Sequence, residues 1–263
     1  MSAGPDAAGA APAPAPAPPG RLVGEVLLLF ALATAIAAAV FQVGRFVPLV
    51  GKHVADLIAV TFYAVPVIAL WRRGRDLDEY GFNLKNWRRG GLLVVAAMMV
   101  VFPAFLVAFL AFYGAVCGPL QHALGVVAAP GLCARFHGLA GAHPAWPGGT
   151  AWATLVAAFT QVVAVGLPEE FFFRGYLQGR LEEALPARRR FLGVPVGQAL
   201  LLASVLFALG HYLIDFDPRR LAVFFPALAF GWMRTASGSI VPGAIFHALC
   251  NLLSDGLHRT FFG

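Results

Sequence analysis

The chain has 263 residues, of which 59% are hydrophobic and 12% charged, and its mean hydropathy is +0.76. A soluble domain needs far more charge on its wetted surface, so this composition excludes one and indicates a polytopic membrane protein. The formal net charge of +6 does not indicate nucleic-acid binding, because Lys and Arg are concentrated in short segments between apolar runs.

The chain opens with an Ala/Pro/Gly-rich segment, residues 1–20, which cannot bury apolar area and is expected to be a disordered tail. The apolar run that follows, 22–43, is too long for the core of a signal peptide and has no basic cluster before it. It is therefore predicted to be a retained first membrane span.

Further apolar runs follow along the chain, none with the alternation of a β-strand. Because a membrane span must satisfy its own backbone hydrogen bonds, they predict an all-α transmembrane bundle of about seven spans. The sixth run is short for a full crossing. In order, the runs cover residues 22–43, 54–71, 91–116, 151–173, 194–214, 221–233 and 240–257.

Basic residues set the expected orientation. Six Lys or Arg lie within 72–89 and five within 174–190, so both segments are expected in the cytoplasm, together with the N-terminus. Arg219 and Arg220 then lie outside, against the trend. Cys117 and Cys133 share a loop that is expected outside, and the sequence leaves open whether they form a disulfide.

Two adjacent carboxylates, Glu169 and Glu170, interrupt the fourth apolar run. An ionisable group inside a membrane is costly, so a functional site is the first interpretation. Pro168 is expected to open a helix here, and Glu170 lies one turn from Arg174, where an ion pair accounts for both. Glu169 is left with no structural role. Residues 176–185 mix polar and apolar positions at helical spacing and predict a helix at the cytoplasmic interface.

Polar side chains recur in two later apolar runs. Phe207 and His211 lie one turn apart in the fifth, and His247 and Asn251 lie one turn apart in the seventh. Each histidine alone is more often a packing residue, and a polar pair can simply join helices. Together with Glu169, however, they form an acid–base set with an oxyanion donor.

Other protease chemistries have no complete motif in this chain. It contains no His-Glu-x-x-His zinc helix and no Gly-x-Ser-x-Gly nucleophile turn. Cys250 neighbours Asn251, and a thiol nucleophile there is a less favoured alternative.

These residues resemble the CPBP family, the CAAX-protease and bacteriocin-processing group of glutamic-type intramembrane endopeptidases. Three motifs carry the resemblance, in the family's order: Glu-Glu-x-x-x-Arg at 169–174, Phe-x-x-x-His at 207–211 and His-x-x-x-Asn at 247–251. The match covers roughly residues 151–257. It suggests a division into the tail 1–20, the N-terminal spans and extracytoplasmic loop 21–150, and a catalytic transmembrane core 151–263.

The resemblance implies that Glu169, assisted by His211, activates water, and that His247 and Asn251 stabilise the oxyanion. Glu170, Arg174 and Phe207 would support this geometry. It implies no tightly bound cofactor and no metal, with zinc held by the glutamate and both histidines as the alternative.

The implied partner is a membrane-associated protein or peptide in the lipid bilayer. The Ala/Arg/Gly/Pro-rich composition favours a bacterial source. For a bacterial inner-membrane protein, the resemblance implies a C-terminal anchor signal or peptide precursor as the substrate, rather than a prenylated CAAX protein. The competing classes are a non-catalytic membrane binding or immunity protein and a transporter, for which no internal repeat is evident.

One difficulty follows from these spans. If the fourth and fifth are simple antiparallel crossings, Glu169 lies near the cytoplasmic end of one and His211 near the outer end of the other. Contact would require a break at 166–168, a deep cytoplasmic cavity or different span limits, and the sequence does not choose among them.

Overall fold

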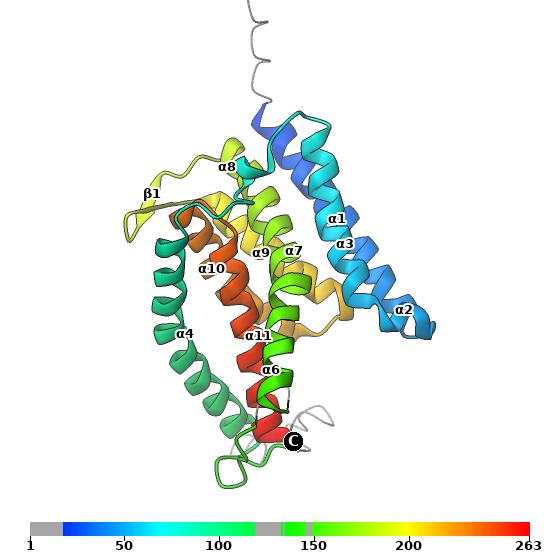
Figure 1. The fold of residues 1–263 in the computed structure, drawn as a ribbon, viewed down its shortest axis with the longest axis vertical. Helices are drawn as coiled ribbons and strands as arrows, with labels where there is room; N and C mark the ends of the chain where they lie inside the picture. The colour runs from blue at the N-terminus through cyan, green and yellow to red at the C-terminus, as the bar shows by residue number, and fades with distance from the viewer. Residues whose placement is uncertain (1–17, 119–132, 134, 146–148) are drawn as a thin grey trace, which may run out of the picture.

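The computed structural model describes residues 18–118, 133, 135–145 and 149–263, and these are almost entirely helical (Figure 1). The all-α, polytopic class predicted from the sequence is confirmed. Residues 1–17 of the predicted tail lie outside the described residues. The first helix begins at Pro19, a residue well suited to a first helical turn, where no backbone N–H is needed.

The described residues form mainly helices and very little sheet. Two short antiparallel strands form the only sheet among them. The elements are α1 (Pro19–Gly44), α2 (Pro48–Lys52), α3 (Val54–Trp71), η1 (Leu77–Tyr80), α4 (Trp87–Val116), α6 (Ala151–Thr160), η2 (Gln161–Gly166), α7 (Leu167–Glu170), η3 (Phe171–Gln178), α8 (Gly179–Ala184), β1 (Arg189–Phe191), β2 (Val194–Val196), α9 (Gln198–Asp215), η4 (Pro218–Val223), α10 (Phe224–Ser237) and α11 (Val241–Phe262).

Within the described residues, five helical stretches are long and apolar enough to cross a membrane: Pro19–Gly44, Val54–Trp71, Trp87–Val116, Ala151–Ala184 and Gln198–Asp215. The sixth and seventh predicted runs correspond to α10 and α11. With 14 residues, α10 spans about 21 Å, less than the ~30 Å hydrocarbon core. Helix α11 is long enough to cross, with 22 residues, but its polar side chains make it less apolar than the five stretches above.

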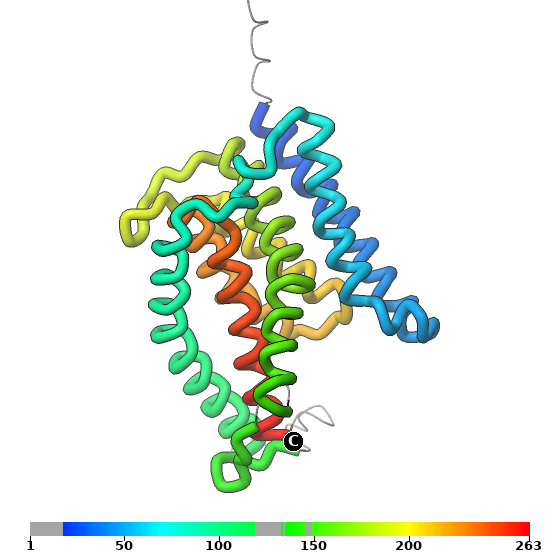
Figure 2. The backbone as a smooth tube through the Cα atoms, in the orientation of Figure 1, coloured from blue at the N-terminus to red at the C-terminus, as the bar shows by residue number. Residues whose placement is uncertain are grey.

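The helices run between two ends of the bundle (Figure 2). Helix α1 starts at one end, α3 returns to it, and α4 leaves it again towards the other end, where the C-terminus also lies. We call the end that holds Pro19, Trp71 and Trp87 the N-terminal end. The opposite end, which holds Cys117, is called the disulfide end.

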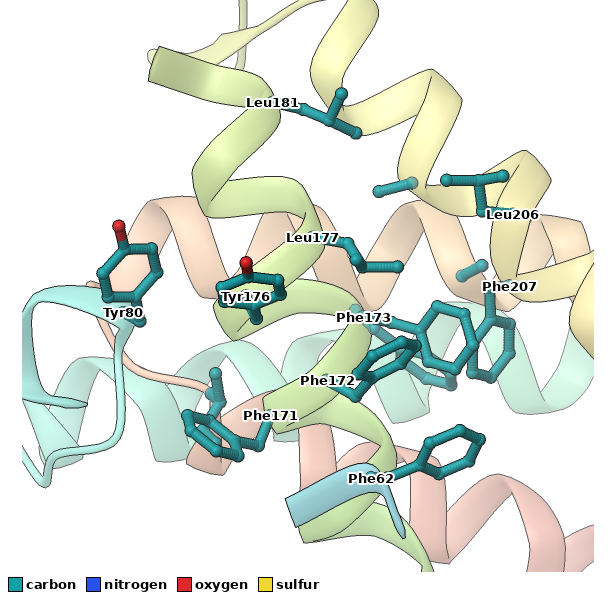
Figure 3. Packing of buried hydrophobic residues seen from close by; sticks show 14 of the residues in the cluster. Phe62, Tyr80, Phe171, Phe172, Phe173, Tyr176, Leu177, Leu181, Leu206 and Phe207 are labelled. Carbon is teal, nitrogen blue, oxygen red and sulfur yellow. The ribbon is translucent and has the colours of Figure 1, made fainter. Parts of the chain in front are cut away.

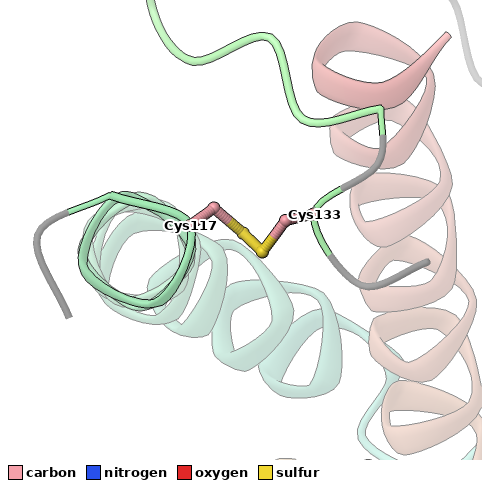
Figure 4. The surroundings of a disulfide bond; sticks show 2 residues. All are labelled: Cys117 and Cys133. Atoms are coloured by element: carbon pink, nitrogen blue, oxygen red, sulfur yellow. A yellow bond between two sulfur atoms is a disulfide. The ribbon is translucent and has the colours of Figure 1, made fainter. Parts of the chain in front are cut away.

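A disulfide joins Cys117 to Cys133 at the latter end (Figure 4). The backbone after it is fastened to α11, because the N–H of His137 donates to the carbonyl of Phe261. Near this hydrogen bond, aromatic rings from α4, the loop and α11 pack together: Phe109, Tyr113, Phe136, Phe261 and Phe262. The pairing that the sequence left open is therefore present.

One helical stretch, Ala151–Ala184, runs unbroken through the middle of the bundle, and it differs from the prediction. Pro168 does not open a helix there. The π-helical turn η2 precedes it, and such a turn accommodates the missing N–H and the ring of an internal proline. Gly166 lets α11 approach closely, since a Cβ there would lie 2.6 Å from the carbonyl oxygen of Ala244.

The core is built of aromatic and aliphatic side chains around this helix (Figure 3). Phe172 stacks on Phe62 of α3, with ring centres 5.0 Å apart, and Phe173 meets Phe207 of α9 edge to face at 5.0 Å. The helix predicted over 176–185 is present as far as Ala184, but it continues the central helix and is not a separate helix on the membrane interface. Tyr176, Leu177 and Leu181 are completely buried, because α1 and α9 pack against this stretch.

Candidate active site

Glu169 and His211 meet in the interior of the bundle. His211 Nε2 lies 3.6 Å from Glu169 Oε2, and His247 Nε2 lies 3.9 Å from the same oxygen. The difficulty posed by simple antiparallel crossings disappears because the helix carrying Glu169 continues to Ala184. Glu169 therefore lies near the middle of a 34-residue helix and not near its end.

The hydrogen bonds of His211 fix which ring nitrogen faces the carboxylate. Nδ1 lies 2.9 Å from the carbonyl oxygen of Phe207, one turn earlier in α9. A carbonyl can only accept, so Nδ1 carries the proton and Nε2 of the neutral ring is an acceptor directed at Glu169. The predicted pair Phe207 and His211 thus interacts through the backbone as well as through ring contact, with centroids 4.4 Å apart.

Glu170 is completely buried and forms the predicted ion pair. Its Oε1 lies 3.0 Å from Arg174 Nη1 and 3.2 Å from His247 Nδ1. Arg174 is also buried; its Nη2 donates to the carbonyl of Ala227, and its guanidinium lies over the Phe207 ring at 4.0 Å. Two buried charges are tolerable only when they are paired, and each of these has several partners.

His247 is held from two sides. Its Nδ1 contacts Glu170, and its ring stacks on Phe230 of α10 with centroids 5.0 Å apart and planes 10° apart. Phe230 is a site residue that motif spacing did not identify as such. Its position in the apolar run before the His247 helix was the available signal.

Asn251 makes a contact that the sequence did not predict. Its Nδ2 donates to Oε1 of Gln161 at 2.9 Å. Gln161 opens the π-helical turn and is a polar residue inside an apolar run, the same signal that marked the other site residues. Asn251 and His247 share one face of α11, as their one-turn spacing predicts.

A cavity of about 440 Å³ lies between the α1–α3 hairpin and the helices that carry Glu169 and His211. Both of these side chains line it, whereas most of its wall is apolar. Glu169 Oε2 is buried and has no hydrogen-bond partner in the described part of the molecule. Because buried acceptors are normally paired, this oxygen is available for a bound molecule. The other lining residues include Thr34, Ala37, Ala59, Phe62, Gly210 and Arg220.

The side chains of Glu169, His211 and His247 are also the candidate ligands for a metal ion. Zinc would need Glu169, His211 and His247 as ligands at about 2.0–2.2 Å from one point. Among the described residues, no group of three or more His, Cys, Asp or Glu side chains has an arrangement that could hold a metal ion.

A family model matches the part of the chain that carries these residues. Residues 150–253 match the family model of type II CAAX prenyl endopeptidase Rce1-like proteins. The matched range contains all three motifs, from Glu169 to Asn251. No curated protein and no solved structure matches the chain.

Proposed function

We propose that this chain is an intramembrane endopeptidase of the glutamic type, because residues 150–253 match the family model of type II CAAX prenyl endopeptidase Rce1-like proteins. One observation carries the proposal: the unpartnered Oε2 of Glu169 faces the Nε2 atoms of His211 and His247 beside a cavity. A base, an orienting imidazole and space for a peptide are what hydrolysis requires.

Water activation would use Glu169 and His211. Glu169 Oε2 and the free Nε2 of His211 are both acceptors at 3.6 Å, so a molecule with two O–H donors can bridge them. Glu169 takes one proton from this water while the water oxygen bonds to the scissile carbonyl carbon. When the tetrahedral intermediate collapses, the C–N bond breaks, and the amine leaves with the proton that Glu169 returns.

Stabilisation of the oxyanion would use His247 and Asn251. Asn251 Nδ2 has two hydrogens, one of which is donated to Gln161, so the other can reach a developing negative charge. Donation from Nε2 of His247 requires a proton on that nitrogen as well. The neighbouring Glu169 and Glu170 would stabilise the resulting imidazolium. Glu170, Arg174 and Phe207 hold these groups in place.

Zinc is the alternative to direct activation by Glu169. The three candidate ligands do not form a metal site among the described residues, and we propose that Glu169 activates water directly. The proposal is a protease without a tightly bound cofactor.

The substrate we propose is a membrane-associated polypeptide, and a bacterial anchor signal or peptide precursor is favoured over a prenylated protein. We place the chain in a bacterial inner membrane with its N-terminus in the cytoplasm. Two features support this orientation. Basic residues are concentrated at the N-terminal end, in 72–89 and 188–190, and the opposite end carries a disulfide, which persists in oxidising compartments.

The test compares membrane-associated peptides by mass spectrometry in cells or proteoliposomes that hold wild type or Glu169→Gln. This substitution keeps the shape of the side chain and removes the base, whereas the control Glu79→Gln makes the same change at a half-exposed position of η1. New peptide termini with wild type and the control, but not with Glu169→Gln, are expected. Identical peptides from all three folded proteins would favour a non-catalytic binding or immunity protein.

A further inference from the structure

We infer that the substrate reaches Glu169 from the disulfide end of the bundle. The substrate class is then a membrane-associated polypeptide whose apolar cleavage segment is exposed on the extracytoplasmic side of the membrane. This inference rests on the proposed peptidase function and orientation, and it adds the side and the route of entry.

The cavity is closed at one end and open at the other. At its inner end, the side chains of Thr34 and Ala37 are buried, and Glu169 and His211 form the wall. The lining residues at its outer end, among them Gly51, Lys52 and Arg220, are exposed. A molecule therefore enters past α2 and η4 and ends at the carboxylate.

The mouth of the cavity lies at the disulfide end, as the path of the chain shows. From Lys52, α3 leads to the N-terminal end, and α4 leads back to Cys117 (Figure 1). Two successive crossings return the chain to the side from which it started. Lys52 and the disulfide consequently belong to the same face of the membrane.

The opposite approach to Glu169 is filled. Directly beyond the site, the buried rings of Phe172, Phe173 and Tyr176 occupy the helix surface (Figure 3). Further along, Glu25 of α1 binds Arg73 at 2.6 Å and Arg180 at 3.3 Å. These contacts join α1, the residues that follow α3, and α8 across the N-terminal end. A peptide arriving from that end would have to displace both the rings and the ion pairs.

The wall chemistry indicates what the cavity accepts. Apart from Glu169 and His211, its deep lining consists of side chains such as Ala37, Ala59 and Phe62, which exclude water and favour apolar groups. An extended apolar segment fits this wall, and its scissile carbonyl would lie at the inner end.

Cysteine accessibility tests the route without requiring the substrate. In a Cys250→Ala background, which removes the free thiol and keeps the disulfide, Thr34→Cys places a thiol of similar size inside the cavity. Lys52→Cys and Arg88→Cys mark the two ends of the bundle, and Ser204→Cys is a buried control outside the cavity lining. A membrane-impermeant methanethiosulfonate is added to spheroplasts or to inverted vesicles.

We expect modification of Thr34→Cys and Lys52→Cys in spheroplasts, of Arg88→Cys only in inverted vesicles, and of Ser204→Cys in neither. Modification of Thr34→Cys only from the face that exposes Arg88→Cys, or from neither face, would overturn the inference. These results do not depend on proteolysis, so a failure of the proposed function appears separately in the Glu169→Gln comparison. If that comparison succeeds, the adduct at Thr34→Cys should also abolish cleavage.

Discussion

Glu170 and His247 share a buried hydrogen bond of 3.2 Å between α7 and α11. The carboxylate that forms it also pairs with Arg174, so one oxygen atom connects the ion pair to the imidazole. Glu170 thereby positions a ring whose other nitrogen faces Glu169. The two adjacent glutamates have separate tasks, because successive residues of a helix point in different directions.

Breaking the buried ion pair of Glu170 and Arg174 by removing one partner should cost more stability than removing both charges. Arg174→Met leaves Glu170 charged and uncompensated, and we expect a loss of about 3–5 kcal/mol in the free energy of unfolding. The double variant Glu170→Gln with Arg174→Met should be more stable than Arg174→Met alone. Unfolding in detergent, followed as a double-mutant cycle, measures the difference; additive effects of the two substitutions would contradict the coupling.

Gln161 is expected to act by orienting the Asn251 amide. Gln161→Leu removes the acceptor and should lower kcat about 10- to 100-fold while KM stays the same, less than the effect of removing the oxyanion donor itself. Gln161→Glu keeps an acceptor oxygen and should restore much of the rate. Kinetics on a peptide identified in the Glu169→Gln comparison decide the matter, with melting temperatures as the control for folding. Equal losses in both variants would rule out this role.

The disulfide should stabilise the end of the bundle to which α11 is fastened. Replacing Cys117 and Cys133 together by Ser opens a loop of sequence separation 16 and should cost about 3 kcal/mol. Cys250→Ser, which removes the free thiol, is the matched control. Thiol trapping in intact cells, read on a non-reducing gel, also reports the compartment. If Cys117 and Cys133 were found reduced in wild-type cells, the proposed orientation would be contradicted.

Stability should fall at alkaline pH through Tyr80. Burial, and then the 2.8 Å hydrogen bond to Glu183, raise the pKa of Tyr80 to about 12. The folded state therefore favours the neutral phenol; its contribution is complete below the ordinary pKa of about 10 and is lost as pH rises towards 12. The contribution is on the order of 1–2 kcal/mol, since Glu183 is one-third exposed. Tyr80→Phe should flatten the pH dependence of the free energy of unfolding between these values.

Strong chelators should leave proteolysis unchanged. The expectation follows from assigning water activation to Glu169 and His211 without a metal. Activity is measured before and after incubation with a chelator, and then after addition of zinc. Loss of activity with recovery on adding zinc would instead favour the metal-dependent alternative.

Much of the fold could be predicted because apolar runs and membrane helices coincide. The run 54–71 has the same limits as α3, and one-turn spacing correctly placed Glu170 beside Arg174. The continuation of the central helix beyond Phe173 could not be predicted in this way. Its mixed polar and apolar surface suits a membrane interface equally well, and only the position of α1 and α9 determines that it is buried.

The candidate site was predictable as a set of residues but not as an arrangement. The motifs pointed to Glu169, His211 and His247, which the structure brings together. The partner of Asn251 depends on how far η2 lies from α11, which is a property of the folded bundle. Gln161 was visible as an isolated polar residue, yet nothing in its local sequence connects it to a position 90 residues later.

The π-helical turn at Gln161–Gly166 also determines the directions in which the side chains of Gln161 and Glu169 point relative to each other. Each residue of an α-helix advances the side-chain direction by about 100°, and a π turn accommodates an additional residue without breaking the helix. Deleting a single residue here could leave an apolar helix of nearly the same length, yet Gln161 and Glu169 would no longer face Asn251 and His211 at the same time. Apart from Gln161 and Gly166, this segment should therefore tolerate changes of side chain far better than changes of length.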